Sequence, residues 1–353
     1  MRVIALLAAY NEERYIANCL ELLGQQGVEA YLIDNESTDR TVAIAEGYRG
    51  RGLVGLETKP RHGRHSLREM LERKEELAAK LKADWFIHMD LDEVRLPPRS
   101  GLTLAQAFQE VEAQGYNAVN FHEFVFVPTQ ESPNHDHRDY LQTMRWYYPY
   151  LPENPHRLNA WRHQSRRVDL STSGGHRVSF PGVRPSPIPF LMRHYHFLNI
   201  EHAASKLTGL PYVQADLARG WHGWRALLRP EMITLPRQAE LRTYISDDDL
   251  DPSNPRLRHH IEECFFQYLP SEPSDLAPQT SDPTVRLAEL ENSIVQLKKR
   301  NAQLENQLQA ANFFWGEARR EVKFLQGTNF YKAARLYWLW RDRVQTWLNK
   351  FPR

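Results

Sequence analysis

Apolar runs of strand length alternate with amphipathic stretches along the first hundred residues of the chain. Four apolar runs have the length of buried strands: residues 3–9, 28–33, 53–57 and 85–89. Three stretches between them carry apolar residues at helical spacing: residues 12–23, 37–48 and 67–81. Strands that alternate with helices form parallel sheets with right-handed crossovers, so we predict an α/β domain of this kind.

The fourth apolar run ends in three carboxylates, Asp90, Asp92 and Glu93. Carboxylates this close disfavour one another's ionised form unless a cation compensates, and divalent ions with oxygen ligands are the usual partners. Successive side chains of a strand point to opposite faces, so we expect Asp90 and Asp92 to share one side. Open α/β sheets bind ligands beyond the carboxyl ends of their strands, which favours a metal site carrying phosphates over a solvated acidic turn.

Three motifs follow the first, second and fourth strands: YNEE (residues 10–13), IDNESTDRT (residues 33–41) and DLDE (residues 90–93). Together they resemble family 2 glycosyltransferases of the GT-A fold, over roughly the first 100 residues. The resemblance implies a GT-A domain at residues 1–268, with a nucleotide-binding half at 1–100 and an acceptor half at 101–268. The glutamate directly after the D-x-D resembles the subgroup with a D-x-D-E signature.

The resemblance also implies ligands for particular side chains. Contacts to the nucleotide-sugar are expected from Ala9, Tyr10, Asn11, Glu12, Asp34, Lys74, Asp90, Leu91 and Lys206. Asp90 and Asp92 are expected to hold a divalent metal, Mn²⁺ or Mg²⁺, on the diphosphate. Lys74 occupies the place of a family arginine, with Arg73 beside it. Either side chain is a candidate for contact with the diphosphate, and a solvated helix face explains both at least as well. Asn35 and Glu36 stand where many family members have Asp-Gly.

The second half of the predicted domain is less regular in its pattern. Residues 104–114 indicate a helix and residues 117–128 a fifth strand. Prolines interrupt residues 129–164, so we predict a long irregular segment there. This segment is rich in aromatic residues: Trp146, Tyr147, Tyr148, Tyr150 and Trp161. Their rings either stack on sugars or pack beneath the segment itself.

Candidates for the catalytic and metal-binding side chains lie in this half. Glu123 is an acid among apolar neighbours, which suits either a general base or the partner of an arginine. Asp169 lies about where the family places its base, and Asp136 is a rival. The resemblance suggests His194 or His176 as the histidine at the metal or diphosphate. His194 is expected at a strand end. One basic side chain is expected to share the diphosphate charge, either Lys206, in a helix, or Arg166.

Composition and charge limit the partners and the cellular location that we expect for the protein. The 353 residues carry 45 basic and 44 acidic side chains, a net charge of +1, which does not favour nucleic acid as a partner. The two cysteines, Cys19 and Cys264, argue against a disulfide framework. Residues 3–9 are too short for a signal peptide or a membrane span. We therefore predict a cytoplasmic protein.

The pattern changes after residue 268. Residues 269–283 have the composition of a linker, and residues 284–326 follow a heptad repeat with one asparagine, Asn301, at a core position. The repeat predicts a homodimer through a parallel coiled coil, or a long helix folded back on its own domain. Residues 327–353 form a basic, aromatic amphipathic tail. It suits peripheral contact with the cytoplasmic face of a membrane, or packing against protein.

Together these features predict a metal-dependent, inverting glycosyltransferase. It would move a sugar from a nucleotide-diphosphate donor to a hydroxyl of a glycan, lipid-linked or protein acceptor. Two other classes stay open. One is a non-catalytic dimeric scaffold at a membrane, in which the coil and tail are the function. The other is a nucleotide-sugar hydrolase or nucleotidyltransferase, which also needs a metal on a diphosphate.

Overall fold

The computed structural model describes residues 1–268, except residues 218, 220 and 222. The predicted linker, coiled coil and tail (269–283, 284–326 and 327–353) lie outside the described residues and stay predictions. In the part of the chain that is described, no helix combines the length and apolarity needed to span a membrane.

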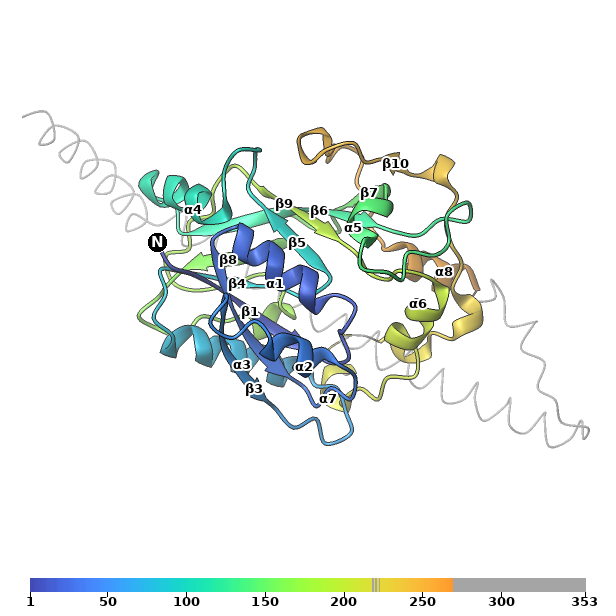
Figure 1. Ribbon diagram of the computed structural model, residues 1–353, viewed down its shortest axis with the longest axis horizontal. Coiled ribbons are helices and arrows are strands. Elements are labelled where there is room, and N and C mark those ends of the chain that lie inside the picture. The colour runs from blue at the N-terminus through green and yellow to red at the C-terminus, as the bar shows by residue number, and fades with distance from the viewer. Residues whose placement is uncertain (218, 220, 222, 269–353) are drawn as a thin grey trace, which may run out of the picture. The chain divides into compact units, whose positions relative to one another are not determined.

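The first four strands form the parallel sheet that the sequence predicts (Figure 1). The elements are β1 (Val3–Ala9), α1 (Ile16–Gln25), β2 (Val28–Asp34), α2 (Thr41–Glu46), β3 (Leu53–Thr58), α3 (Leu67–Lys80) and β4 (Trp85–His88). Strand β1 pairs in parallel with β2 and β4, and β2 pairs in parallel with β3. The carboxyl ends of β1, β2 and β4 therefore lie at one edge of the sheet, where the three motifs begin.

The later strands extend the sheet on the β4 side. They and their helices are β5 (Glu93–Leu96), α4 (Leu104–Ala113), β6 (Ala118–Phe126), α5 (Tyr140–Thr143), β7 (Trp146–Tyr150), β8 (Arg157–Arg162), η1 (Ser171–Ser173), β9 (Phe190–His194), α6 (Ile200–Leu207), α7 (Gln214–Leu217), β10 (Arg242–Thr243) and α8 (His260–Tyr268). The strand order is β10-β7-β6-β8-β4-β1-β2-β3. Strand β9 pairs in parallel with β6 and in antiparallel with β5. The described sheet is therefore mixed.

Strand β1 explains why an unbroken apolar run forms the centre of the sheet. Its odd-numbered side chains, such as Leu7, pack with the apolar faces of α1 and α4. Its even-numbered side chains, Ile4 and Leu6, pack on the other face with α3, through Met70 and Leu71. Both faces are buried, so the alternation of apolar and polar residues seen in half-exposed strands is absent from β1.

The prediction of an irregular segment at residues 129–164 was wrong. The segment contains α5 and two strands, β7 and β8, each paired with β6. Pro149 is tolerated because it lies opposite Phe124 of β6 at a point that the two-residue strand β10 does not reach. The aromatic residues of β7 and β8 mostly face the core, since Tyr147, Tyr148 and Trp161 are buried. Of the two alternatives predicted for the aromatic rings, Tyr147, Tyr148 and Trp161 therefore follow packing within the fold.

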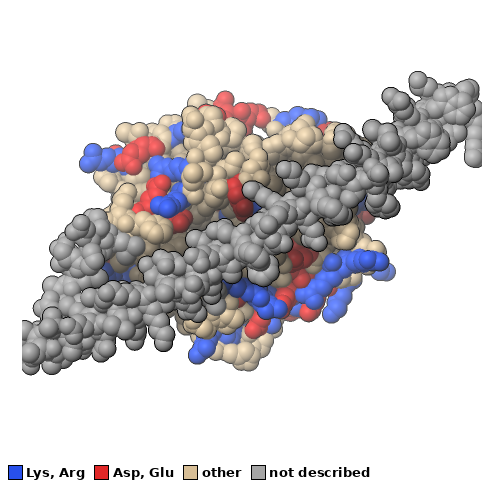
Figure 2. Space-filling model, turned by 180° about the vertical axis from the view of Figure 1, so that it is seen from behind, with Lys and Arg blue, Asp and Glu red and all other residues tan. Residues whose placement is uncertain are grey.

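Charged side chains of both signs are interspersed on the face of the molecule shown in Figure 2. Exposed ion pairs also occur in the described protein, as between Arg49 and Glu46 and between Arg177 and Glu153. Such pairs contribute little to stability because water and salt screen them.

Candidate functional site

The D-x-D residues lie in a turn and not on a strand, which corrects the alternation expected from the sequence. Strand β4 ends at His88 and β5 begins at Glu93, so Asp90 and Asp92 lie in the connecting turn. Asp90 is exposed, and its backbone N–H donates to the Glu93 carboxylate at 3.0 Å. Asp92 is 6% exposed and its carboxylate points into the molecule. The chain turns away from β4 here, since β5 pairs with β9 and not with β1 or β8, the neighbours of β4.

A lysine from α6 joins the turn to the loop after β1. The Lys206 Nζ lies 3.0 Å from Asp92 Oδ2 and 3.1 Å from Glu12 Oε1, as well as over the Tyr15 ring. Burial raises the pKa of Glu12 to about 7, against the attraction of Lys206. Burial acts on Asp92 in the same direction, but Lys206 and His194 hold the pKa of Asp92 well below its usual range. Asp92 is therefore ionised at neutral pH. The helix predicted around Lys206 is confirmed.

A histidine from β9 lies on the other side of Asp92. His194 ends its strand, as predicted, and its Nε2 lies 3.5 Å from Asp92 Oδ2. Its Nδ1 donates to Glu123 Oε1 at 2.6 Å. Burial opposes the charged imidazole, but Asp92 and Glu123 together raise the pKa of His194 to about 9. The carboxylate of Glu123 thus fixes the ring orientation that aims Nε2 at Asp92.

Glu123 is itself held from two directions. Arg157, at the start of β8, donates from Nε to Glu123 Oε2 at 2.6 Å. Burial alone would raise the pKa of Glu123, but Arg157, His156 and His194 hold it well below the usual range. Both carboxylate oxygens have cationic or imidazole partners. Of the two roles weighed for Glu123, the structure shows the arginine pairing, and a role as base stays a prediction.

These contacts form one chain of alternating charge across the site. From the loop after β1 to the interior of β5 its members are Glu12, Lys206, Asp92, His194, Glu123, Arg157, Glu93 and Arg95, with neighbouring polar atoms 2.6–4.0 Å apart. They come from both halves of the domain. Buried charges are tolerated when each has opposite-sign partners, so this chain fixes the acceptor-half strands against the D-x-D turn.

The site also contains residues able to hold a metal ion. Among the described residues, Glu123, His194 and His196 are all buried and place one ligand atom each within 4.8 Å of one another. Asp92 lies next to this group through its contact with His194. Imidazole and carboxylate donors together suit Mn²⁺ and similar ions better than Mg²⁺, which prefers oxygen ligands. Asp90 and His176, two further predicted ligands, are not members of this group.

The two loops expected to bind the nucleotide are tied to each other. The backbone N–H of Asn11 donates to Ser37 Oγ at 3.0 Å, and the Asn11 side chain accepts from the N–H of Thr38 at 2.8 Å. The carbonyl of Ala9 accepts from the N–H of Asn35. Asp34 ends β2, is 2% exposed, and accepts from the N–H of Ser37. The loops after β1 and β2 are therefore preorganised as one unit at the carboxyl edge of the sheet.

Other predicted nucleotide contacts differ in how they are placed. The Arg61 guanidinium lies 3.5 Å from the centroid of the Tyr10 ring. A cationic group therefore lies beside Tyr10, which was predicted to contact the nucleotide. Leu91 is a core residue, 3% exposed. Lys74 is buried behind the D-x-D turn, where its Nζ contacts His88 Nδ1 at 2.9 Å and the Met89 carbonyl at 3.2 Å.

Lys74 is buried, so the interpretation of its position as a solvated helix face is wrong. Burial lowers its pKa to about 8. Arg73, by contrast, pairs with Glu57 and Glu76 on the outer side of α3.

Several predicted side chains have their hydrogen bonds elsewhere. The Asp169 carboxylate accepts from Ser171 Oγ and the Thr172 N–H, so it closes the turn at η1; its role as base stays a prediction. Asp136 pairs with Arg14. Arg166 is exposed. His176 stacks on His156, with ring centroids 4.8 Å apart.

The sequence analysis did not single out Arg157 or His196. Arg157 was not predicted as a site residue because its strand lies in the segment that was predicted to be irregular. His196 belongs to the same RHYH run as His194, and that run was the signal available for it.

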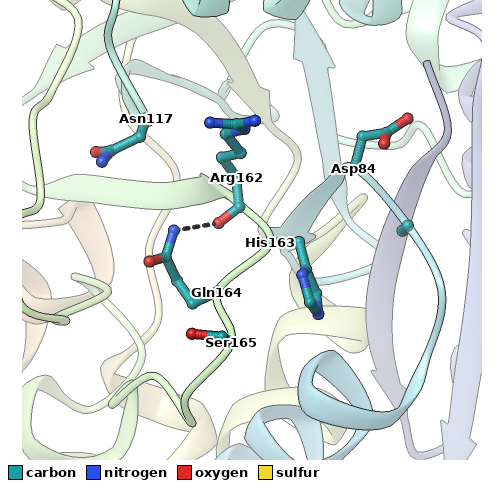
Figure 3. Close-up of a pocket in the computed structure, with 7 residues that line it drawn as sticks. Asp84, Asn117, Arg162, His163, Gln164 and Ser165 are labelled. Atoms are coloured by element: carbon teal, nitrogen blue, oxygen red, sulfur yellow. Dashed lines mark hydrogen bonds between the residues drawn. The ribbon is translucent and has the colours of Figure 1, made fainter.

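A separate polar pocket lies at the opposite end of β4 (Figure 3). It has a volume of about 430 Å³ and is lined by Ala83, Asp84, Asn117, Arg162, His163, Gln164 and Ser165. Asp84 precedes β4, whereas Asp92 follows it, so this pocket is not part of the charged site.

Comparison with known proteins agrees with the motif positions. Residues 5–119 match the model of the family described as glycosyl transferase family 2. The chain carries a glycosyl transferase family 2 domain. The matched residues run from β1 into β6, so they include the D-x-D turn and every nucleotide-loop residue described above. The mixed α/β sheet is consistent with the GT-A fold, while the D-x-D-E subgroup stays a prediction. No curated protein matches the chain.

Several solved structures are similar to part of this chain. S. aureus TarS 1–349 in complex with UDP is 19% identical, with a TM-score of 0.26, over 37% of this chain and 36% of that one. A second structure of TarS 1–349 is 14% identical, with a TM-score of 0.33, over 55% and 60%. Glucosyl-3-phosphoglycerate synthase from Mycobacterium tuberculosis, in complex with Mn²⁺, UDP and glucosyl-3-phosphoglycerate, is 19% identical, with a TM-score of 0.24, over 35% and 44%.

The chain thus spans between 36% and 60% of the length of these solved chains. Such low TM-scores carry no argument for a shared activity.

Proposed function

We propose that the protein transfers a sugar from a nucleoside diphosphate donor to an acceptor hydroxyl, with inversion at the anomeric carbon and with a bound divalent metal. The observation that carries this proposal is the position of the Glu12, Lys206 and Asp92 group. It lies at the carboxyl edge of the parallel strands; Glu12 and Asp92 are among the residues matched by the family model, and Lys206 reaches them from α6. Open α/β sheets bind their ligands at this edge.

The chain's own residues support donor binding from two sides. The joined loops after β1 and β2 offer the Tyr10 ring and Asp34 to the nucleoside. Glu123, His194 and His196 are the residues that would hold the metal, with Asp92 beside them. When bound, a divalent metal neutralises charge on a departing diphosphate. Lys206 is a second cation at the same place, and it stabilises negative charge there without leaving its helix.

The acceptor half supports transfer to an acceptor. Glu123 and Arg157 fix the orientation of His194. The acceptor-half strands are therefore held in a fixed position relative to the D-x-D turn. Fixed donors and charges stabilise a transition state better than mobile ones because they need no reorganisation during the reaction. Sugar transfer breaks the anomeric carbon–phosphate oxygen bond and forms a bond to the acceptor oxygen, whose proton passes to a base.

Calorimetric titration tests the proposal. UDP, GDP, CDP and dTDP are each titrated into the full chain with Mn²⁺, with Mg²⁺ and with chelator. We expect one nucleotide to bind in a metal-dependent way, and Asp92→Asn to lose this binding. Asp84→Asn is the matched control because Asp84 lies at the other end of β4 and pairs with the backbone N–H of Arg2. Absence of binding by all four nucleotides would refute the proposal.

A further inference from the structure

A third loop lies beside the two loops expected to bind the nucleotide. It follows β3 and contains Lys59 and Arg61. The backbone N–H of Lys59 donates to the Asp34 carbonyl at 2.8 Å, and the Asn35 side chain donates to the Lys59 carbonyl at 2.9 Å. The backbone N–H of Arg61 donates to Glu36 Oε2 at 2.9 Å. The loop after β3 is therefore fixed to the loop after β2, at the carboxyl edge of the sheet.

The residue that holds Arg61 has a strained backbone. Glu36 has φ +61°, in the left-handed region that glycine adopts freely and that other residues seldom enter. Such strain persists only where the surrounding structure compensates for it, and it gathers at ligand sites. Glu36 is exposed, and its carboxylate accepts from the N–H of Arg61. The strained residue therefore has one evident role, which is to keep Arg61 in place.

The Arg61 side chain lies over an aromatic ring and lacks an acceptor. Its guanidinium carbon is 3.5 Å from the centroid of the Tyr10 ring, which belongs to the loop after β1. Its Nη1 atom is buried and has no hydrogen-bond partner among the described residues. Within the part of the chain that the structure describes, no carboxylate forms an ion pair with the guanidinium. A buried donor without a partner is costly, and a ligand that accepts from it removes this cost.

The geometry of the guanidinium indicates the kind of acceptor that suits it. Its N–H donors lie in one plane and point outwards from the edge, and the group has no acceptor of its own. One face of Arg61 is covered by Tyr10, so a planar base beside this stack meets the edge of the guanidinium. A base carbonyl accepts from such donors, as guanine does from arginine in nucleic-acid complexes. An exocyclic amino group is itself a donor and would leave the guanidinium unpaired.

The stack lies among the residues expected to contact the nucleoside. Tyr10 follows β1, Asp34 ends β2, and Arg61 is held against both of their loops. We infer that Arg61 selects donor nucleotides whose base carries a carbonyl oxygen, O4 of uracil or thymine or O6 of guanine, over those with the amino group of cytosine or adenine. Glu36 is the positioning residue for Arg61. This inference rests on the proposed function and names the class of donor.

Pairs of nucleotides that exchange the carbonyl for an amino group test the selection. UDP and CDP form the pyrimidine pair, and inosine diphosphate and ADP form the purine pair. The dissociation constant of each nucleotide is measured by calorimetry with the full chain and the metal that supports binding. In the pair whose ring size the site accepts, the carbonyl member should bind about ten- to hundredfold more tightly, because a hydrogen bond from a charged donor is strong.

Variants separate base selection from charge and from folding. Arg61→Met removes the guanidinium, and Arg64→Met is the matched control because Arg64 is an exposed arginine of the same loop. Glu36→Gly keeps the charge of Arg61 but removes its anchor, and glycine permits the left-handed backbone. Glu36→Gln restores an acceptor for the N–H of Arg61. Thermal unfolding shows whether each full-length variant is folded, and the two Glu36 variants decide the matter if Arg61→Met unfolds early.

The ratio of the two dissociation constants in a pair is the result that decides. Arg61→Met and Glu36→Gly should reduce this ratio to within about threefold, while Arg64→Met and Glu36→Gln should keep it. Glu36→Gly should unfold at the wild-type temperature or above, because glycine relieves the strain; a purely structural role of Glu36 predicts a lower temperature.

Two results would overturn the inference and leave the proposed function standing. One is a wild type that binds CDP or ADP as tightly as the carbonyl member of its pair. The other is an equal loss of affinity for both members in Arg61→Met, which would show that Arg61 acts through its charge alone. A wild type that binds no nucleotide overturns the inference and the proposed function together.

Discussion

Replacing Glu123 by glutamine should destabilise the protein far more than the same change at an exposed ion pair. The Glu123 side chain is fully buried, and its two oxygens hold Arg157 and His194 at 2.6 Å each. Removing one member of a buried pair leaves an uncompensated charge, which costs about 3–5 kcal/mol of unfolding free energy. Glutamine still accepts one hydrogen bond, and Glu93 lies 4.0 Å from Arg157, so we expect about 3 kcal/mol, the lower end of that range.

Glu153→Gln is the matched control. Glu153 pairs with Arg177 at 3.0 Å, but the two side chains are 47% and 41% exposed. Exposed pairs contribute up to about 1 kcal/mol. Urea unfolding of the full chain, followed by tryptophan fluorescence, gives both free energies provided that the slope against urea is unchanged. Equal losses in the two variants would show that Glu123 is not the electrostatic centre described above.

The pH dependence of the same variants gives a second check. His194 has a folded pKa of about 9 against an ordinary 6.5, so its charged form stabilises the fold fully below pH 6.5. That stabilisation is lost as the pH rises through 9. Since Glu123 contributes to the shift, the destabilisation caused by Glu123→Gln should be larger at pH 6.5 than above pH 9. A pH-independent difference between variant and wild type would contradict this origin of the shift.

Two further predictions follow from buried contacts behind the D-x-D turn. A Cβ on Gly175, at φ +87°, would lie 2.6 Å from His88 Nε2, whereas one on Gly182, at φ +80°, would meet no atom within 4 Å. Alanine at either position incurs backbone strain of about 1–3 kcal/mol. Gly175→Ala should therefore lower the unfolding temperature clearly more than Gly182→Ala does. Lys74, whose pKa burial lowers from 10.5 to about 8, binds its proton more weakly when folded. The unfolding free energy should therefore rise between pH 8 and 10.5, and Lys74→Met should remove that rise in urea titrations at successive pH values.

The candidate site shows where sequence reasoning reached its limit. The positions of His194 at a strand end and of Lys206 in a helix were predictable, because apolar periodicity defines such local elements. Their contacts with Asp92 were not, since they join residues 102 and 114 positions apart. Arg157 escaped notice for a related reason. Its strand is short, closely preceded by prolines, and stabilised by pairing with β4 and β6 rather than by its own pattern.

The sequence by itself determined the parallel core and the edge of the sheet at which the three motifs lie. The apolar runs of β1 and β4 are almost wholly buried on both faces, and the acidic and polar motifs follow directly on three of the four runs. Only the tertiary structure decided that Asp92 points inward while Asp90 is exposed, and that Glu123 holds an arginine and a histidine. Side-chain orientation in a turn, and the pairing of buried charges, depend on what long-range strand pairing brings alongside. No local pattern encodes that information.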